Sequence, residues 1–208
     1  MYAMQSPIRG ACQTRFSFGM TFCIFKDIKH HMKKYFAIIA IVAISLCSFK
    51  WEKPAAPAEN GHIKWLTWAE AQAAQKKAPK KIFVDVYTDW CGWCKRMDAT
   101  TFENPAIAKY MSENFYCVKF NAETKEEIIF KGQKYGNDGR TNSLATFLLQ
   151  NRMSYPTTVY LDEELNLLSV VPGYLDPKAA EPVLSYFGTN SYKTTAWEDY
   201  QKNFKGSL

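Results

Sequence analysis

Residues 81–94 constrain the fold of this chain more than any other stretch. Residues 81–87 read KIFVDVY, a run rich in β-branched and aromatic residues. The run is too short for a helix and suits a strand that is buried on both faces. Cys91 and Cys94 follow directly, separated by two residues. The sequence therefore predicts a pair of thiols where a central strand passes into a helix.

Start signals for two helices lie on either side of this stretch. Thr67 and Glu70 form a capping-box pattern that predicts a short helix before the strand. Asn104 followed by Pro105 predicts the start of another helix after the cysteines, because Pro suits the first helical position. Residues 115–120 then return as a strand. The order to this point is helix, strand, helix, strand.

The segment between residues 122 and 153 is longer than an ordinary connection, and we interpret it as a helical insertion. Thr124 and Glu127 form a second capping-box pattern. Glycines in residues 136–139 interrupt the chain before another helical stretch at residues 144–148. The sequence does not indicate what this insertion does.

The last third of the chain predicts a hairpin and two helices. Residues 157–161 and 167–171 flank a polar turn and predict two antiparallel strands. Asp176 caps a helix beyond them, and Thr195 with Glu198 is expected to cap an amphipathic C-terminal helix. Strands that alternate with helices and close with a hairpin predict an α/β fold with a central mixed sheet flanked by helices.

Residues 84–95, VDVYTDWCGWCK, closely resemble the thioredoxin signature. In that signature a buried Asp precedes the first cysteine by six residues and a Trp directly precedes it, and Asp85 and Trp90 hold these places. The resemblance covers roughly residues 62–188. It implies a thioredoxin fold, here with a helical insertion and an added C-terminal helix, and thiol:disulfide exchange without a bound cofactor. Among relatives, the chain looks most like exported thioredoxin-like proteins with a similar insertion.

The positions of the two cysteines predict different roles for them. Cys91 is expected at the N-terminus of a helix, where free N–H groups and the helix dipole favour the thiolate, so we expect it to be the nucleophile. Cys94 lies one helical turn further in and is the expected resolving thiol. Such a pair could also be half of a zinc site, but the body offers only Cys117 and His62 as further ligands. We therefore expect no metal site.

Asp85 is the second expected catalytic residue. It interrupts an apolar run, so its carboxylate needs either a raised pKa or a cationic neighbour. The resemblance implies that it relays a proton to the resolving cysteine beside a strand lysine, for which Lys119 is the match. Two simpler interpretations stay open: Asp85 bonds to neighbouring backbone, and Lys119 is an ordinary exposed strand residue.

The substrate-binding residues are implied by the same resemblance. Tyr155-Pro156 resembles the family's cis-proline segment, which holds the backbone of the preceding residue open for a substrate strand. A trans proline at the start of a strand is the alternative. Gly173 matches the glycine that lines the binding groove.

The residues around the cysteines complete the expected groove. Trp90, Gly92 and Trp93 are expected to face the substrate, although both tryptophans could instead pack within the domain. The chain departs from a plain thioredoxin in having Gly-Trp rather than Gly-Pro between the cysteines, and in the insertion before Pro156. Both departures leave the redox potential and the choice of partner open.

These residues predict a thiol:disulfide oxidoreductase that acts on protein cysteines, more as a reductase or isomerase than as an oxidase. Such an enzyme needs a membrane electron donor or acceptor to restore its pair. A binding module without turnover is one alternative, and the intact Cys91 and Cys94 argue against it. A metal-delivery protein is another, and it would need a further Cys or His near the pair. We expect a monomer.

The N-terminal part predicts export. Residues 1–47 hold five of the six net positive charges, so the remaining body lacks the basic face that nucleic acid requires. Lys33 and Lys34 precede an apolar run of about a dozen residues, which is typical of a signal peptide and short of the about 20 residues that a membrane span needs. An uncleaved anchor and lipidation of Cys47 are the alternatives. From the signal peptide we expect a periplasmic or other extracytoplasmic location.

The domain boundaries follow from these features. Residues 32–47 form the expected signal peptide, and residues 1–31 would then precede the true start at Met32. Residues 48–61 are rich in Pro and Ala and form the expected linker, and residues 62–208 form the thioredoxin-like domain.

We expect the mature N-terminus to lie near Ser48, because Ser45 and Cys47 place small residues at the cleavage positions. Mass spectrometry of the protein from a bacterial envelope fraction measures this end. A chain that keeps Met1 or Met32 would instead be membrane-anchored.

Overall fold

The computed structural model describes residues 62–137 and 139–206. The expected signal peptide, the linker and Cys47 lie outside these residues, so those interpretations remain predictions. Within the described part of the chain, no helix is both long enough and apolar enough to span a membrane.

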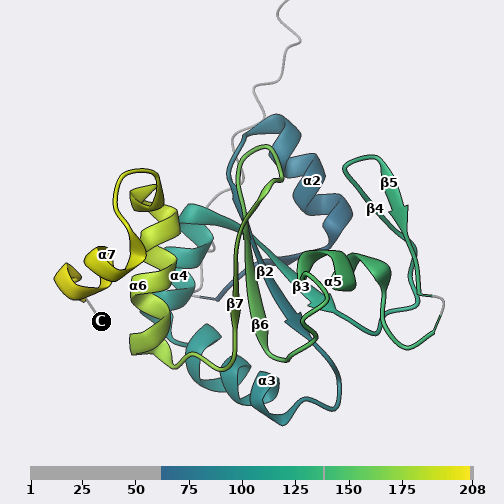
Figure 1. Ribbon diagram of the computed structural model, residues 1–208, viewed down its shortest axis with the longest axis horizontal. Coiled ribbons are helices and arrows are strands. Elements are labelled where there is room, and N and C mark those ends of the chain that lie inside the picture. The colour runs from purple at the N-terminus through teal and green to yellow at the C-terminus, as the bar shows by residue number, and fades with distance from the viewer. Residues whose placement is uncertain (1–61, 138, 207–208) are drawn as a thin grey trace, which may run out of the picture. The chain divides into compact units, whose positions relative to one another are not determined.

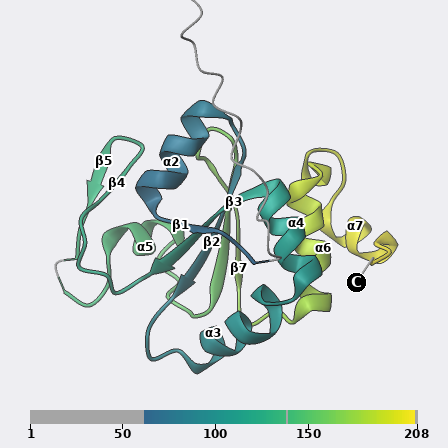
Figure 2. The same cartoon turned by 180° about the vertical axis from the view of Figure 1, so that it is seen from behind.

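Five strands form a central mixed sheet in the order β1-β3-β2-β6-β7 (Figures 1 and 2). Strand β3 pairs in parallel with both β1 and β2, whereas β6 is antiparallel to β2 and β7. The bounds are β1 (Trp65–Leu66), β2 (Lys81–Tyr87), β3 (Phe115–Asn121), β6 (Thr157–Leu161) and β7 (Leu167–Pro172). The central position of β2 explains its composition, because both of its faces are covered.

Helices cover the two faces of this sheet. Helices α2 and α5 supply residues to the core on one face, and α4 and α6 supply residues to the core on the other (Figures 1 and 2). The bounds are α2 (Trp68–Lys77), α3 (Gly92–Met97), α4 (Pro105–Asn114), α5 (Ser143–Leu148), α6 (Pro177–Gly188) and α7 (Trp197–Asn203). A π-helical turn, η1 (Asp98–Phe102), extends α3, and a 3₁₀ turn, η2 (Ser191–Lys193), follows α6. This layered α/β arrangement confirms the predicted fold class.

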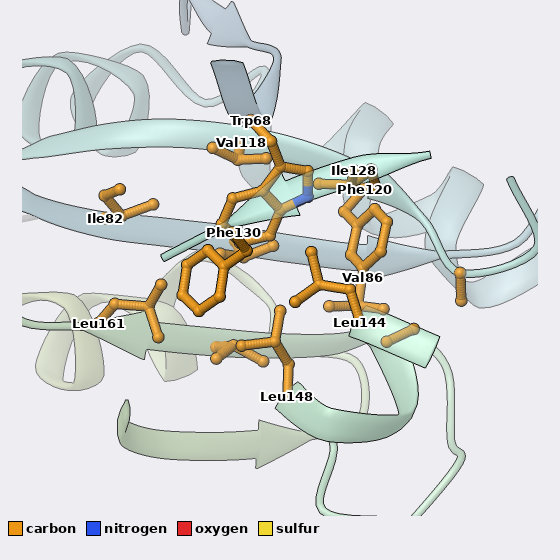
Figure 3. Close-up of a cluster of buried hydrophobic side chains, with 14 of the residues drawn as sticks. Trp68, Ile82, Val86, Val118, Phe120, Ile128, Phe130, Leu144, Leu148 and Leu161 are labelled. Atoms are coloured by element: carbon orange, nitrogen blue, oxygen red, sulfur yellow. The ribbon is translucent and has the colours of Figure 1, made fainter. Parts of the chain in front are cut away.

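The alternation of side chains along β2 divides the two cores. Ile82, Val84 and Val86 enter the first core, in which the ring of Trp68 packs edge-on against that of Phe120 at 5.6 Å (Figure 3). Phe83 enters the second core on the opposite face. Because the strand period is two, Asp85 shares the face of Phe83. The carboxylate therefore lies on the side of the sheet that α4 and α6 cover.

Three of the predicted helix starts are confirmed. In the capping box of α2, the Glu70 amide donates to Thr67 Oγ1 at 3.2 Å and the Thr67 amide donates to the Glu70 carboxylate at 2.8 Å. The side chains of Asn104 and Asp176 accept from backbone amides at the starts of α4 and α6. Local side-chain to backbone bonds therefore fix where these helices begin.

The second capping box, predicted at Thr124 and Glu127, is wrong. The insertion there forms an antiparallel hairpin of β4 (Ile128–Phe130) and β5 (Gln133–Tyr135), and its helix is α5. Thr124 Oγ1 accepts from the amide two residues on, and Glu127 forms an ion pair with Lys134 at 2.8 Å. The residues that follow alternate between buried and exposed, so a period of two overrides the local helix signal.

The expected cap of the C-terminal helix is also wrong. Helix α7 begins after Ala196 without a side-chain cap. The Thr195 carbonyl instead accepts a hydrogen bond from the Tyr186 hydroxyl at 2.7 Å. Aromatic packing positions the helix, because the rings of Tyr200 and Tyr186 lie 4.9 Å apart. Tertiary contact thus replaces the local signal.

Candidate active site

Cys91 and Cys94 form a disulfide at the start of α3, with their Cα atoms 5.3 Å apart. Cys91 is the residue that caps this helix, and the Cys94 amide donates to its sulfur at 3.1 Å. The same amide would stabilise a thiolate on Cys91 after reduction. Both residues are buried. The sequence-predicted position of the pair, between β2 and a helix, is confirmed, and the separate roles of the cysteines remain predictions.

Asp85 has the cationic neighbour that its burial requires. Its side chain is 1% exposed, and its Oδ2 atom lies 2.6 Å from Lys119 Nζ. The contact follows from strand register, because these two residues are partners on the parallel strands β2 and β3. Lys119 is therefore not the ordinary exposed strand residue that the sequence left open.

The environment of Asp85 moves its titration toward neutrality. Burial raises the pKa of Asp85 to about 6, although the charge of Lys119 lowers it in part and that of Asp98 raises it. A carboxyl with this pKa can both accept and release a proton near neutral pH, which is what general acid–base catalysis requires.

Asp98 is a site residue that the sequence analysis missed. It begins η1 and forms an ion pair with Lys119, which thus bridges two carboxylates. Burial opposes the charge on Lys119, but the two carboxylates outweigh it and raise its pKa. Asp98 follows Cys94 by four residues, which places it one turn along the same helical face. That spacing is the signal that could have indicated it.

Aromatic rings line the rest of the Lys119 environment. Its Nζ atom lies 5.1 Å from the ring centroids of Trp65 and Tyr87 and 5.3 Å from that of Phe102. Such cation–π contacts favour the charged amine. The lysine is therefore held as a cation beside Asp85.

Trp90 projects from the surface beside the insertion. Its side chain is 67% exposed, and its indole N–H donates to both carboxylate oxygens of Glu123 at 3.1 Å. Its ring meets that of Tyr155 edge-on at 5.9 Å. Burial, together with the charge of Glu123, raises the pKa of Tyr155. The insertion thus contributes a charged residue beside the redox motif.

Trp93 belongs to a second aromatic group. It is 57% exposed, and its ring lies 5.4 Å from that of Tyr174. The guanidinium of Arg96 lies over both rings, at 5.5 Å and 5.8 Å from their centroids. The exposure of both tryptophans excludes the interpretation that they merely pack inside the domain. Glu123, Arg96 and Tyr174 carry no motif signal, so the sequence analysis did not find them.

Pro156 and Gly173 are brought together at the end of the β6–β7 hairpin. The Tyr155–Pro156 peptide bond is cis, which confirms that geometric prediction. The Gly173 amide donates to the Pro156 carbonyl at 2.8 Å, and Gly173 has a φ of +97°, a conformation that favours glycine. Gly92 is exposed between the cysteines. The binding roles of these residues remain predictions.

Cys117, the third cysteine among the described residues, is not part of the disulfide. Cys117 is free and buried on β3, and burial raises its pKa to about 12. Among residues 62–137 and 139–206, no cluster of three or more His, Cys, Asp or Glu side chains could hold a metal ion.

A family model described as Thioredox_DsbH, protein of unknown function DUF255, matches residues 56–206. The chain belongs to this family. An uncharacterized Caenorhabditis elegans protein is 36% identical over 70 residues, which is 33% of this chain and 10% of the worm protein. The Oryza sativa protein disulfide isomerase-like 5-3 is 26% identical over 159 residues, covering 65% of this chain and 36% of the rice protein.

Among solved structures, one titled DsbH oxidoreductase is 17% identical, covers 71% of this chain and 94% of its own, and has a TM-score of 0.45. Of the two curated relatives, the chain spans only a tenth of the length of the worm protein and about a third of the length of the rice protein. The Thioredox_DsbH family is a thioredoxin-like family, which agrees with the resemblance carried by residues 84–95.

The raised pKa of Asp85 makes the stability of the oxidised protein depend on pH. Because the folded pKa of about 6 lies above the ordinary value of 3.8, this carboxyl favours folding below pH 3.8 and loses that contribution as the pH rises through 6. As the pH rises from about 4 to about 8, we expect the free energy of unfolding of Asp85→Asn to increase relative to that of the parent by on the order of 3 kcal/mol. Urea unfolding at both pH values measures this gain.

Asp89→Asn is the matched control, because Asp89 is exposed and accepts a hydrogen bond from Asn121. It should leave the pH dependence of the parent intact. An Asp85→Asn protein whose stability relative to the parent is the same at both pH values would contradict the assigned pKa.

Proposed function

We propose that this chain is a thiol:disulfide oxidoreductase that acts on protein cysteines outside the cytoplasm. The observation that carries the proposal is the Cys91–Cys94 disulfide, which caps α3 directly beyond the buried strand that holds Asp85. The name of the rice relative, a protein disulfide isomerase-like protein, supports the same chemistry. The predicted signal peptide supports the location.

In the first step, the reduced enzyme captures a substrate disulfide. The Cys91 thiolate attacks one sulfur of the substrate, the substrate S–S bond breaks, and a new bond joins Cys91 to that sulfur. The other substrate sulfur leaves as a thiolate and takes a proton. The Cys94 amide that donates to Cys91 Sγ in the oxidised state supports Cys91 as the attacking residue.

In the second step, the enzyme releases the substrate. The Cys94 thiol gives its proton to the Asp85 carboxylate and attacks Cys91 Sγ, so the mixed disulfide breaks and the Cys91–Cys94 disulfide forms. The second substrate sulfur leaves as a thiolate and takes a proton from water, and Asp85 then releases the proton it accepted. Two electrons have moved from the enzyme dithiol to the substrate, and a dithiol donor at the membrane would have to restore them.

We favour reduction or isomerisation over oxidation as the direction. A buried carboxyl with a pKa of about 6 is ionised at neutral pH and can accept the Cys94 proton, which the releasing step needs. The Lys119 cation beside it lowers the pKa that burial would otherwise raise further, so the carboxyl is ionised at neutral pH. Measuring the equilibrium of the pair against a dithiothreitol series tests the direction.

The different positions of the cysteines predict different behaviour of their variants. We expect Cys94→Ala to accumulate mixed disulfides with substrate proteins, because capture proceeds while release is blocked. Cys91→Ala should accumulate few. Non-reducing electrophoresis of envelope extracts after acid quenching measures the adducts, and Cys117→Ala is the matched control because that thiol is buried. Adducts on Cys91→Ala with none on Cys94→Ala would reverse the two roles.

Asp85→Asn should slow release and leave capture nearly unchanged. Without a carboxylate to accept the Cys94 proton, we expect resolution of the mixed disulfide to slow by about 10- to 10³-fold. Stopped-flow reduction of a model disulfide, followed through the fluorescence of Trp90 and Trp93, separates the two steps. Asp89→Asn serves again as the control. If Asp85→Asn slows neither step, or slows both equally, Asp85 is structural.

A further inference from the structure

The two aromatic groups beside the disulfide present charges of opposite sign. One contains Trp93 from the redox motif and Tyr174 from the segment after β7, with the Arg96 guanidinium over both rings. The other contains Trp90 from the motif and Tyr155, with the Glu123 carboxylate bound to the indole. Each group therefore joins one exposed tryptophan to one charged side chain.

Arg96 is positioned but not neutralised. Among the described residues, no carboxylate pairs with it, and its side chain is exposed on α3. The Tyr174 ring under it is itself held, because its hydroxyl lies 2.9 Å from Thr100 Oγ1. A guanidinium that lies over aromatic rings and has no carboxylate partner keeps its N–H donors free, and these suit a carboxylate.

Glu123 is likewise held in place, and its carboxylate can accept further hydrogen bonds. The bond from Trp90 uses one N–H, whereas a carboxylate can accept about four hydrogen bonds. Its backbone is fixed as well, since the Glu123 amide donates to Asn121 Oδ1 at 2.9 Å and Asn137 Nδ2 donates to the Glu123 carbonyl at 3.1 Å. The residue can therefore meet a cation without losing its contact with the tryptophan.

We propose that Arg96 and Glu123 select substrates by charge, so that the preferred substrate is an extended cysteine-containing segment with an acidic residue on the Trp93 side of its cysteine and a basic residue on the Trp90 side. The inference rests on the proposed function and defines its substrate class. An extended segment is the occupant because Trp90 and Trp93 flank Cys91 in the sequence, so a segment bound at Cys91 can contact the group of each tryptophan with residues on either side of its cysteine. Opposite charges then fix the direction in which the segment lies.

The test measures capture by the reduced protein. Each of three peptides carries one cysteine as a mixed disulfide with 5-thio-2-nitrobenzoate. When Cys91 bonds to the peptide sulfur, 5-thio-2-nitrobenzoate is released, and its absorbance measures the rate of capture. One peptide has Glu before and Lys after the cysteine, the second has the reverse order, and the third has Gln at both positions. At low salt we expect one charged order to react about two- to fivefold faster than the other, which is the range of an exposed ion pair.

The variants assign this preference to the two residues. Arg96→Gln and Glu123→Gln should each reduce the ratio between the two orders, and exchange of both charges in Arg96→Glu with Glu123→Lys should invert it. High salt should weaken it. Lys95→Gln is the matched control, since it removes an adjacent exposed charge that contacts neither aromatic group in any described interaction, and it should keep the ratio.

Equal rates for the two charged orders would overturn the inference, and so would a ratio that Lys95→Gln reduces as much as Arg96→Gln. Reaction of the neutral peptide that is lost in Cys91→Ala establishes exchange chemistry independently of charge. A protein that captures none of the three peptides would overturn the proposed function itself, and the charge selection with it.

Discussion

The ion pair between Asp85 and Lys119 is the interaction on which the arrangement of the site depends. A carboxylate that is 1% exposed in the centre of a sheet is costly unless a cation meets it. The parallel register of β2 and β3 supplies that cation on the neighbouring strand. Asp98 then holds the same lysine from η1, at the end of the helix that carries the cysteines. A single lysine thus connects the sheet to the redox helix.

Strand β2 relates this charge network to the fold. Its alternate residues divide between two apolar cores, so the strand is fixed from both faces, as Figure 3 illustrates for the first core. Residues 88–90 join its end to the Cys91 cap of α3. A rigid strand therefore positions the disulfide, and a loop would do so less precisely. The cost of burying Asp85 is offset by its lysine partner and remains visible as a raised pKa.

The surface around the disulfide comes from parts of the chain that are far apart in sequence. The insertion places Glu123 against Trp90, and the segment after β7 places Tyr174 against Trp93. Within this chain, the chemistry is proposed to reside in the buried Cys91, Cys94 and Asp85, and the choice of substrate in Arg96 and Glu123.

The sequence by itself determined the elements whose signals are local. The run at residues 81–87, the caps at Thr67, Asn104 and Asp176, and the position of the cysteine pair are encoded within a few residues, because hydrogen bonds and side-chain periodicity act over that range. Tertiary structure decided what depends on distant neighbours. The pattern at residues 124–127 became a turn before a hairpin because the buried alternation beyond it prevailed. Glu123 joined the site through its bond to Trp90, and Arg96 joined it through its contact with Tyr174, and no local pattern records either contact. The spacing of Asp98 from Cys94 is a local sign, but its ion pair with Lys119 formed only on folding.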